Sequence, residues 1–386
     1  MAKKRKQYYC NSVVNPVYQT ATYYFENTEQ VINYHLGRTK VGRYARYDNP
    51  SWLEVEEKLA ILDKCEDALV FPSGMSAIAA TLFTFLSVGE NFLFTGKGYR
   101  NIRNFSFDIL GRFGIDVITL PLANGDNFYE RFTSSYKSNT KVIFVESPSN
   151  PHLFLVDLQK IKERIDETTI LIVDSTFSTP INFQPKLFGA DLVIHSCGKY
   201  IGGHADMMAG SVAGSTQLIS KIRKTRNVIG NIIDPQAAFL LNRSLSTLEI
   251  RINNLNEKGL LLAKFLESHP KVTKVFYTGL DSHPQNDLAK KYLSGHGGVV
   301  TFEIKGRKED VSNFIDNIKL PYMGTNFGSS YSMIEQLSIF TYFNQTKGEK
   351  KDLGITDNLV RYSIGLDDSI DAIISDIDIT FSSFTQ

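Results

Sequence analysis

Six short apolar runs constrain the fold of this chain more than any other feature of its sequence. Most of them are separated from the next run by a polar or helix-length segment. Because each run is apolar along its whole length, the runs are typical of parallel strands that are covered on both faces. The pattern therefore predicts an α/β fold built on a mostly parallel sheet. The runs are DALVFPSG from Asp67, NFLFTG from Asn91, IDVITLP from Ile115, KVIFVES from Lys141, TILIVDST from Thr169 and ADLVIHS from Ala190.

After about Arg251 the pattern of apolar and polar residues changes. It now predicts amphipathic helices such as KEDVSNFIDNIK and isolated strands such as GGVVTFEI and LVRYSIG. With 386 residues, of which 42% are hydrophobic, the chain is long enough for more than one domain. We expect a large domain over residues 49–250 and a smaller C-terminal α+β domain over residues 251–386. Residues 1–48 are rich in Tyr, Asn and Arg and show no core pattern, which predicts an arm lying on another subunit.

Charge and cysteine content narrow the class of protein. The formal net charge of +1 argues against nucleic acid as the main partner. No stretch is long and apolar enough to cross a membrane. The three cysteines, Cys10, Cys65 and Cys197, lack the paired spacing of a zinc site or a disulfide framework, so no metal is expected. A reducing, cytoplasmic location fits this composition best.

The distinctive polar residues follow the ends of the predicted strands, where open parallel sheets bind ligands. In PSGMS, the amides of Gly74 and Met75 could hold an anion at a helix N-terminus, although a strand-to-helix turn often needs glycine for geometry alone. Asp174 ends a very apolar strand and could simply cap the next segment. Ser196 and Lys199 end another strand in HSCGKY. A buried lysine is costly unless it has a partner or a reaction.

Together, a phosphate cradle, a buried acid and a buried amine are what pyridoxal 5′-phosphate requires. The amine forms a Schiff base with the aldehyde, the acid keeps the pyridine nitrogen protonated, and the cradle holds the phosphate. The segment SCGKY lacks the earlier glycine of a Walker-type phosphate loop, and the sequence has no dinucleotide fingerprint. The combination predicts a pyridoxal-phosphate enzyme.

At these residues the chain resembles the Cys/Met-metabolism pyridoxal-phosphate-dependent enzymes, the trans-sulfuration family of cystathionine γ-synthase, cystathionine γ-lyase, cystathionine β-lyase and methionine γ-lyase. The resemblance implies fold type I of the pyridoxal-phosphate-dependent transferases, as in aspartate aminotransferase, with a mostly parallel seven-stranded sheet. It also implies a homotetramer built from two active dimers. The motifs run nearly end to end: NPVYQTATYYF, YARYDNPSWLEVEEKLAILDKCEDALVFPSGMSAI, VESPSNP, IVDSTFSTP, HSCGKYIGGHADMMAGSV, RSLSTLEIR, GLDSHPQNDLAKKYLSGHGGVVTFEI and LVRYSIGLDD.

The resemblance also implies residue roles. Lys199 matches the Schiff-base lysine, which also moves protons, Asp174 the acid that pairs with the pyridinium nitrogen, and Tyr99 the tyrosine that stacks on the ring. The positions that bind the cofactor's phosphate and its surroundings are Gly74, Met75, Thr176 and Ser196, with Tyr44 and Arg46 reaching in from the neighbouring subunit.

Substrate-binding roles follow in the same way. Arg361 matches the arginine that binds the α-carboxylate of the substrate, and Asn150 lies near that carboxylate. The chain departs from the family in substrate handling: YRNI replaces YGGT after Tyr99, and Gly198 replaces a threonine before the lysine. GHAD replaces GHSD, and NPSW replaces NPTR.

The family segment SLGGxESL followed by HPAxMTH corresponds to residues 322–344, with Tyr322 at the leading serine and without the glutamate and the Thr-His pair. Arg100 and Arg103 add positive charge where the family has small or neutral residues. These changes predict that Arg100 binds a substrate with an anionic side chain or leaving group. The other interpretation is that both arginines face solvent.

The resemblance implies γ-elimination or γ-replacement on a small-molecule L-amino acid, that is, a lyase or transferase of cystathionine, methionine or cysteine metabolism. One alternative is β-elimination or a specialised biosynthetic γ-replacement. Another is a regulatory protein that binds the cofactor without turnover, although retention of both Lys199 and Asp174 argues against it. An aminotransferase is also possible, and the YARYDNPS arm disfavours it.

Overall fold

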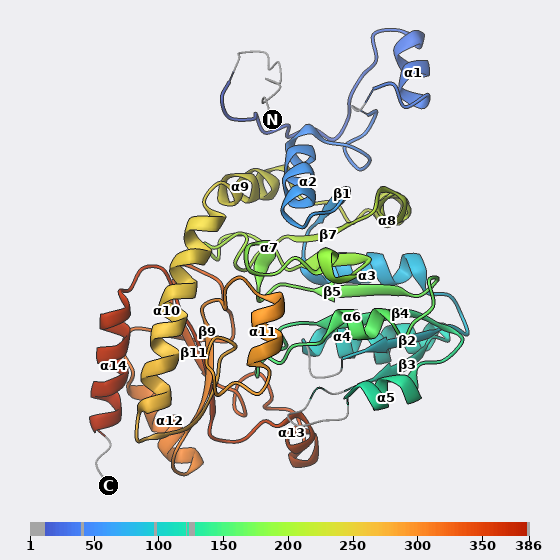
Figure 1. The fold of residues 1–386 in the computed structure, drawn as a ribbon. Coiled ribbons are helices and arrows are strands. Elements are labelled where there is room, and N and C mark those ends of the chain that lie inside the picture. The colour runs from blue at the N-terminus through green and yellow to red at the C-terminus, as the bar shows by residue number, and fades with distance from the viewer. Residues whose placement is uncertain (1–11, 40–41, 96–98, 121, 123–127, 384–386) are drawn as a thin grey trace.

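The computed structural model describes residues 12–39, 42–95, 99–120, 122 and 128–383. Cys10 therefore lies outside the described residues. Figure 1 shows an N-terminal arm that projects from a body containing two sheets. Within the described residues, no helix has the length and apolar character needed to span a membrane.

The larger sheet has seven strands in the order β1-β7-β6-β5-β4-β2-β3. The pairs β2–β3, β2–β4, β4–β5 and β5–β6 are parallel, and β7 runs antiparallel to both of its neighbours. The first six strands coincide with the six apolar runs, which confirms the predicted mostly parallel α/β sheet. The strands are β1 (Asp67–Phe71), β2 (Asn91–Phe94), β3 (Asp116–Thr119), β4 (Thr140–Glu146), β5 (Ile170–Asp174), β6 (Leu192–His195) and β7 (Gly210–Gly214).

The described residues up to 245 also form helices and helical turns, of which α1 lies on the projecting arm and α3 begins directly after the turn that follows β1. They are α1 (Thr28–His35), α2 (Pro50–Leu62), α3 (Gly74–Phe85), α4 (Arg100–Asn104), η1 (Phe105–Ile109), η2 (Leu110–Phe113), α5 (Phe128–Ser135), α6 (Leu158–Lys162), α7 (Thr179–Asn182), η3 (Pro185–Phe188), α8 (Thr216–Ile229) and α9 (Pro235–Leu245). The helix expected from MSAIAATLFTFL is α3. Its N-cap residue, Ser73, accepts a hydrogen bond from the backbone N–H of Ser76.

The smaller sheet has the order β10-β11-β12-β9-β8, and long helices lie beside it. The expected helix KEDVSNFIDNIK is α12, and the expected strands GGVVTFEI and LVRYSIG contain β9 and β12. The domain boundaries at residues 48/49 and 250/251 stay predictions. The elements are α10 (Leu248–Ser268), β8 (Val272–Phe276), α11 (Asn286–Tyr292), β9 (Val299–Ile304), α12 (Lys308–Asn317), β10 (Tyr322–Met323), β11 (Met333–Gln336), α13 (Lys347–Leu353), β12 (Leu359–Ser363) and α14 (Ile370–Ser383).

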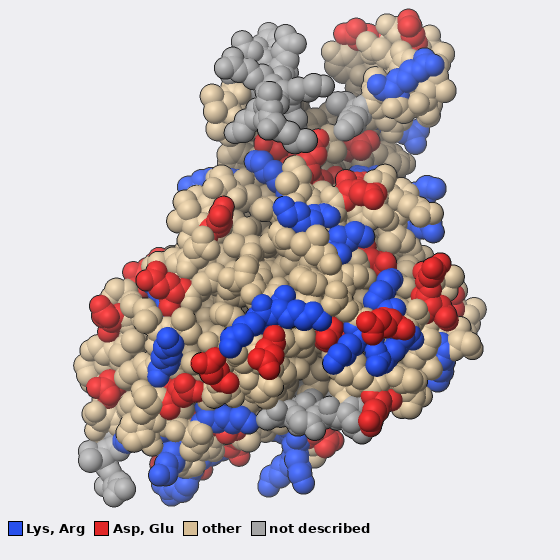
Figure 2. All heavy atoms as spheres, in the orientation of Figure 1, with Lys and Arg blue, Asp and Glu red and all other residues tan. Residues whose placement is uncertain are grey.

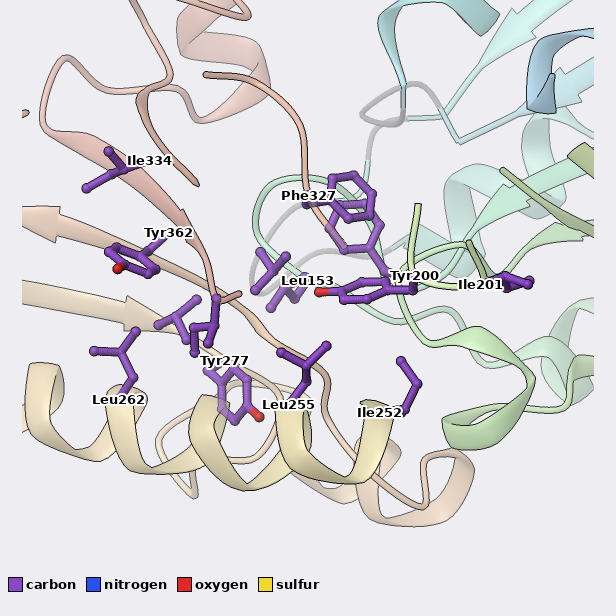
Figure 3. Packing of buried hydrophobic residues seen from close by; sticks show 14 of the residues in the cluster. Leu153, Tyr200, Ile201, Ile252, Leu255, Leu262, Tyr277, Phe327, Ile334 and Tyr362 are labelled. Carbon is purple, nitrogen blue, oxygen red and sulfur yellow. The ribbon is translucent and has the colours of Figure 1, made fainter. Parts of the chain in front are cut away.

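One hydrophobic cluster joins the two sheets. It contains Tyr200 and Leu153 from the larger sheet's loops together with Tyr277, Tyr362 and the inner face of α10. Figure 3 shows Leu255 and Ile252 of α10 directed toward the aromatic residues above them. The shared core fixes the small domain against the carboxyl ends of the large sheet's strands.

Arg251 on α10 ties this helix to the segment after Lys199. Its guanidinium is almost completely buried and donates hydrogen bonds to the backbone carbonyls of Tyr200 at 2.6 Å, Ile201 at 2.9 Å and Ser244 at 2.9 Å. Since carbonyl oxygens of a loop need partners when buried, Arg251 holds the loop after Lys199 against the start of α10.

Lysine and arginine side chains are mixed with aspartate and glutamate over the face drawn in Figure 2. This distribution agrees with the nearly balanced charge of the whole sequence, which contains 42 Lys and Arg residues and 41 Asp and Glu residues.

Candidate active site

A cavity of about 520 Å³ lies where β1, β4, β5 and β6 end. Because these strands belong to one sheet, their following loops converge on the same edge. Eight of the residues predicted to bind the cofactor or substrate line this cavity: Gly74, Met75, Tyr99, Asn150, Asp174, Thr176, Ser196 and Lys199.

The turn between β1 and α3 approaches its neighbours so closely that only glycine fits. A Cβ on Gly74 would lie 2.9 Å from the Cβ of Ser196, and one on Gly210 would lie 2.2 Å from the carbonyl oxygen of Ser73. The N-terminus of α3 and Ser196 therefore meet at one wall of the cavity. Unpaired amides at a helix N-terminus attract anions, so this wall is suited to a phosphate group.

Asp174 is held rigidly at the end of β5. Its Oδ1 accepts hydrogen bonds from the Thr176 backbone N–H at 3.0 Å and the Thr176 hydroxyl at 2.5 Å. The Thr176 hydroxyl oxygen in turn accepts a hydrogen bond from the backbone N–H of Ser196 at 2.8 Å. Among the described residues both hydrogen bonds go to Oδ1, which leaves Oδ2 for a donor inside the cavity. The carboxylate is thus oriented toward a cationic or N–H group.

Lys199 brings an amine to the same cavity. Its Nζ lies 4.0 Å from the ring centroid of Phe327 and 5.4 Å from that of Tyr99. Burial lowers the pKa of Lys199 to about 8, and the opposing charges of Asp174 and Glu146 limit this decrease. A neutral amine is nucleophilic, so this lysine is suited to attack a carbonyl carbon near neutral pH.

Arg361 lies at the centre of β12, at the border of the cavity. It is almost fully buried and pairs with the equally buried Glu335 of β11 at 2.6 Å, where the two residues are register neighbours. Its Nη1 donates to the Asn150 side-chain oxygen at 3.0 Å, and its Nη2 donates to the Thr325 carbonyl. The guanidinium is therefore fixed beside Asn150, which itself lines the cavity.

Two residues predicted to bind the cofactor lie away from the cavity in this subunit. Tyr44 is 42% exposed, and Arg46 donates to the Asn227 carbonyl and to the Tyr47 hydroxyl. Neither lines the cavity, which is the arrangement expected for residues that serve another subunit. Their roles stay predictions.

The two arginines after Tyr99 also lie outside the lining of the cavity. Arg100 is exposed at the start of α4, and Arg103 is 3.6 Å from the carboxylate of Glu349. The role of Arg100 in substrate binding stays a prediction. Tyr322, which we matched to a family serine, is 63% exposed on β10, whereas Asn326 of the same segment lines the cavity.

The structure adds residues that the sequence analysis did not select. Glu146 and Phe177 line the cavity, Phe327 lies over the amine of Lys199, and Glu335 neutralises Arg361. Glu146 could have been found, because it ends an apolar run exactly as Asp174 does. Phe327 and Glu335 carry no such signal, since their partners lie far away in the sequence.

The comparisons with known proteins agree with this geometry. The family model described as "Cys/Met metabolism PLP-dependent enzyme" matches residues 1–382. The chain is 38% identical over 359 residues to cystathionine gamma-synthase 1, chloroplastic, of Arabidopsis thaliana, covering 93% of this chain and 63% of that protein. It is 35% identical over 367 residues to L-methionine gamma-lyase of Fusobacterium nucleatum subsp. polymorphum, covering 94% and 92%. It is 34% identical over 364 residues to cystathionine beta-lyase of Lactococcus lactis subsp. cremoris, also covering 94% and 92%.

Among solved structures, the crystal structure of metB from Corynebacterium glutamicum is similar with a TM-score of 0.87 and 27% sequence identity. The superposition covers 98% of this chain and 94% of that one. The likeness therefore includes both sheets.

Proposed function

The chain belongs to the Cys/Met-metabolism family of pyridoxal-phosphate-dependent enzymes, and on this basis we propose that it catalyses γ-elimination or γ-replacement on an L-amino acid of trans-sulfuration metabolism. Its fold is fold type I, as predicted. The observation that carries the proposal is the convergence of the Lys199 amine and the Asp174 carboxylate in one cavity with the N-terminus of α3.

The residues of the cavity fit pyridoxal phosphate, the cofactor of the family. The amides at the start of α3 and Ser196, which lie against each other because Gly74 has no side chain, would hold the phosphate. The available Oδ2 of Asp174 would accept a hydrogen bond from the protonated pyridine nitrogen, and Lys199 would hold the aldehyde carbon. When bound, the cofactor supplies an electron sink for the pair released by breaking the Cα–H bond.

The protein's own groups then bind the amino acid and move protons. Arg361, held by Glu335 and Asn150, would bind the α-carboxylate through its remaining donors. As a free amine, Lys199 would take the proton from Cα of the bound amino acid. A pKa of about 8 suits this exchange, because the amine can accept a proton and return it near neutral pH.

The assembly and location are part of the proposal. We propose a homotetramer of two active dimers in the cytoplasm, in which Tyr44 and Arg46 complete the neighbouring subunit's phosphate site. Exposed apolar side chains along the arm support this arrangement, among them Tyr24, Ile32 and Leu36, since such residues gain most by covering a partner. Sedimentation of the purified protein measures the mass of the assembly, and cell fractionation locates it.

The chemistry is tested by offering the purified enzyme cystathionine, methionine, homocysteine, cysteine and O-acylhomoserines. Mass spectrometry of the products would identify 2-oxo acid, ammonia, thiols and new amino acids. Production of 2-oxobutanoate from a γ-substituted substrate would indicate γ-elimination, and a new thioether would indicate γ-replacement. Cleavage of cystathionine to pyruvate and homocysteine would instead show β-elimination. A wild-type protein that binds the cofactor but converts none of these substrates would contradict the proposal.

A further inference from the structure

Glu146 is a buried acid of the cavity to which the mechanism above assigns no role. It is the last residue of β4 and the register neighbour of Asp174 on β5, so two carboxyl groups end adjacent strands. Burial, together with the charge of Asp174, raises the pKa of Glu146 to about 7. An acid kept in such surroundings needs compensating contacts.

Both carboxylate oxygens of Glu146 accept a hydrogen bond, each from a backbone amide of a different loop. Oε2 accepts the N–H of Tyr99 at 2.6 Å, and Oε1 accepts the N–H of Asn150 at 2.7 Å. The side-chain oxygen of Asn150 then accepts a hydrogen bond from Arg361. One carboxylate thus contacts the loop of the tyrosine predicted to stack on the cofactor and, through Asn150, the arginine proposed to bind the substrate.

We propose that Glu146 is a positioning residue that fixes the Tyr99 ring and the Asn150–Arg361 pair relative to each other. The inference rests on the proposed function, because that function gives Tyr99 and Arg361 their roles. Only an ionised carboxylate accepts a strong hydrogen bond at each oxygen, whereas an amide or a protonated acid turns one acceptor into a donor facing an N–H. Ionised Glu146 therefore holds both loops, and neutral Glu146 releases one of them.

The charged and titratable groups around Glu146 come from four other segments. They are Asp174 on β5, Lys199 after β6, Tyr342 in the turn after β11, and Arg361 on β12. Asp174 disfavours ionisation of Glu146, and the ammonium form of Lys199 favours it. The positioning effect is consequently present above about pH 7 and lost below it.

The test is the affinity of the apoprotein for pyridoxal phosphate, measured by visible absorbance at pH 6 and pH 8 in wild type and Glu146→Gln. At pH 8 we expect the variant to bind roughly tenfold more weakly, since it loses one hydrogen bond to a charged group. At pH 6 the wild-type acid is itself neutral, so the two proteins should differ by no more than about twofold. If the ratio of the variant's dissociation constant to that of the wild type is the same at pH 6 and pH 8, ionisation of Glu146 does not contribute to binding. That result would overturn the proposal.

Glu66→Gln is the matched control. The Glu66 carboxylate also accepts a hydrogen bond from a backbone amide, that of Thr216 at 2.9 Å, but Glu66 does not line this cavity. The control should bind the cofactor like wild type at both pH values. If Glu146→Gln does not fold, Glu146→Asp replaces it, because this variant keeps both oxygens but is one methylene too short to reach both amides. Wild-type affinity in Glu146→Asp at pH 8 would contradict the inference.

Unfolding of the apoprotein gives a readout that needs neither cofactor nor substrate. The unfolded chain releases the Glu146 proton near pH 4.5, whereas the folded chain holds it until about pH 7. The free energy of unfolding of wild type, relative to Glu146→Gln, should therefore decrease as the pH rises between these values. A difference that does not change with pH would overturn the assigned titration. Absence of cofactor binding by the wild type would instead contradict the proposed function.

Discussion

At the scale of single residues, the environment of Lys199 decides what its amine can do. The ring centroids of Phe327 and Tyr99 lie 4.0 Å and 5.4 Å from Nζ, and the carboxylates of Asp174 and Glu146 interact with the amine. Burial and the charge of Arg361 favour the neutral amine, whereas the carboxylates of Asp174 and Glu146 favour the ammonium form. Their balance places the pKa near 8, within the range in which a group can both take and give a proton.

Replacement of the amine gives the first prediction. Lys199→Ala should lose all measurable turnover while keeping the fold, because the variant lacks both the cofactor linkage and the proton carrier. Borohydride treatment of the wild type should attach the cofactor to a peptide containing Lys199. Lys137→Ala, at an exposed lysine paired with Asp116, is the control and should keep full activity. A label on another lysine would show that the assignment is wrong.

The ring of Phe327 gives the second prediction. Phe327→Leu keeps an apolar side chain but removes the aromatic face over Nζ, so the pKa of Lys199 in the apoprotein should fall by less than about one unit. The pH dependence of the rate at which pyridoxal phosphate reacts with the apoprotein reports this pKa, because only the neutral amine reacts. An unchanged midpoint would mean that the ring does not stabilise the ammonium.

Sequence patterns anticipated the site only in part at this scale. Asp174, Ser196 and Lys199 stand at the ends of apolar runs, where chain topology alone brings them together. Phe327 and Glu335 belong to a segment that meets the cavity only through the packing of the small domain. No local pattern encodes that approach, since it depends on how two sheets share a core.

At the scale of elements, the six apolar runs were sufficient to predict β1 to β6. Strand β7 was not evident, because its sequence GSVAG has one β-branched residue and two glycines. It forms because antiparallel pairing with both β1 and β6 buries it completely. Tertiary pairing therefore overrides weak local propensity in this strand.

The arm is the element whose role can be tested most directly. Arg46→Ala should weaken retention of pyridoxal phosphate in the assembled protein, because the side chain is expected to contact the neighbouring subunit's phosphate. Gel filtration followed by absorbance of the protein peak measures this loss. Arg38→Ala, also on the arm and hydrogen-bonded to Asn33, should retain the cofactor. An active monomer would show that the arm does not complete the site.

Helix α10 is the second element with a testable role. Arg251→Ala would leave the carbonyls of Tyr200 and Ile201 buried without the arginine donor, at a cost of about 1–3 kcal/mol for each unpaired group. The Ser244 carbonyl would keep its hydrogen bond from the Thr247 backbone N–H. We expect a large decrease in the midpoint of chemical unfolding, together with weaker cofactor binding through the loop after Lys199. Stability equal to that of wild type would contradict the importance of these contacts.

At the scale of the whole molecule, one hydrophobic cluster runs through both sheets and α10. Neither domain closes its core without the other, since Tyr200 and Leu153 lie against Tyr277 and Leu255 in the same cluster (Figure 3). The boundary near residue 250 stays a prediction, and we expect that the two parts of the chain that it separates do not fold independently.

The shared cluster leads to the last prediction. A fragment of residues 251–386 should fail to form a stable fold, because it would expose the cluster residues that pack against the large sheet. Circular dichroism and proton NMR of the fragment test this directly. A dispersed NMR spectrum from the isolated fragment would show that the small domain folds alone.

The close approach at Gly74 and Gly210 has a consequence for how the protein can change over generations. A library that randomised both positions should return almost only glycine after selection for function, because any added carbon would collide with Ser196 or with the backbone of Ser73. Tyr322, which is 63% exposed and outside the lining of the cavity, should in contrast tolerate many replacements in such a library. Steric exclusion thus fixes the wall of the cavity that is proposed to hold phosphate, whereas exposed positions outside the cavity are free to change.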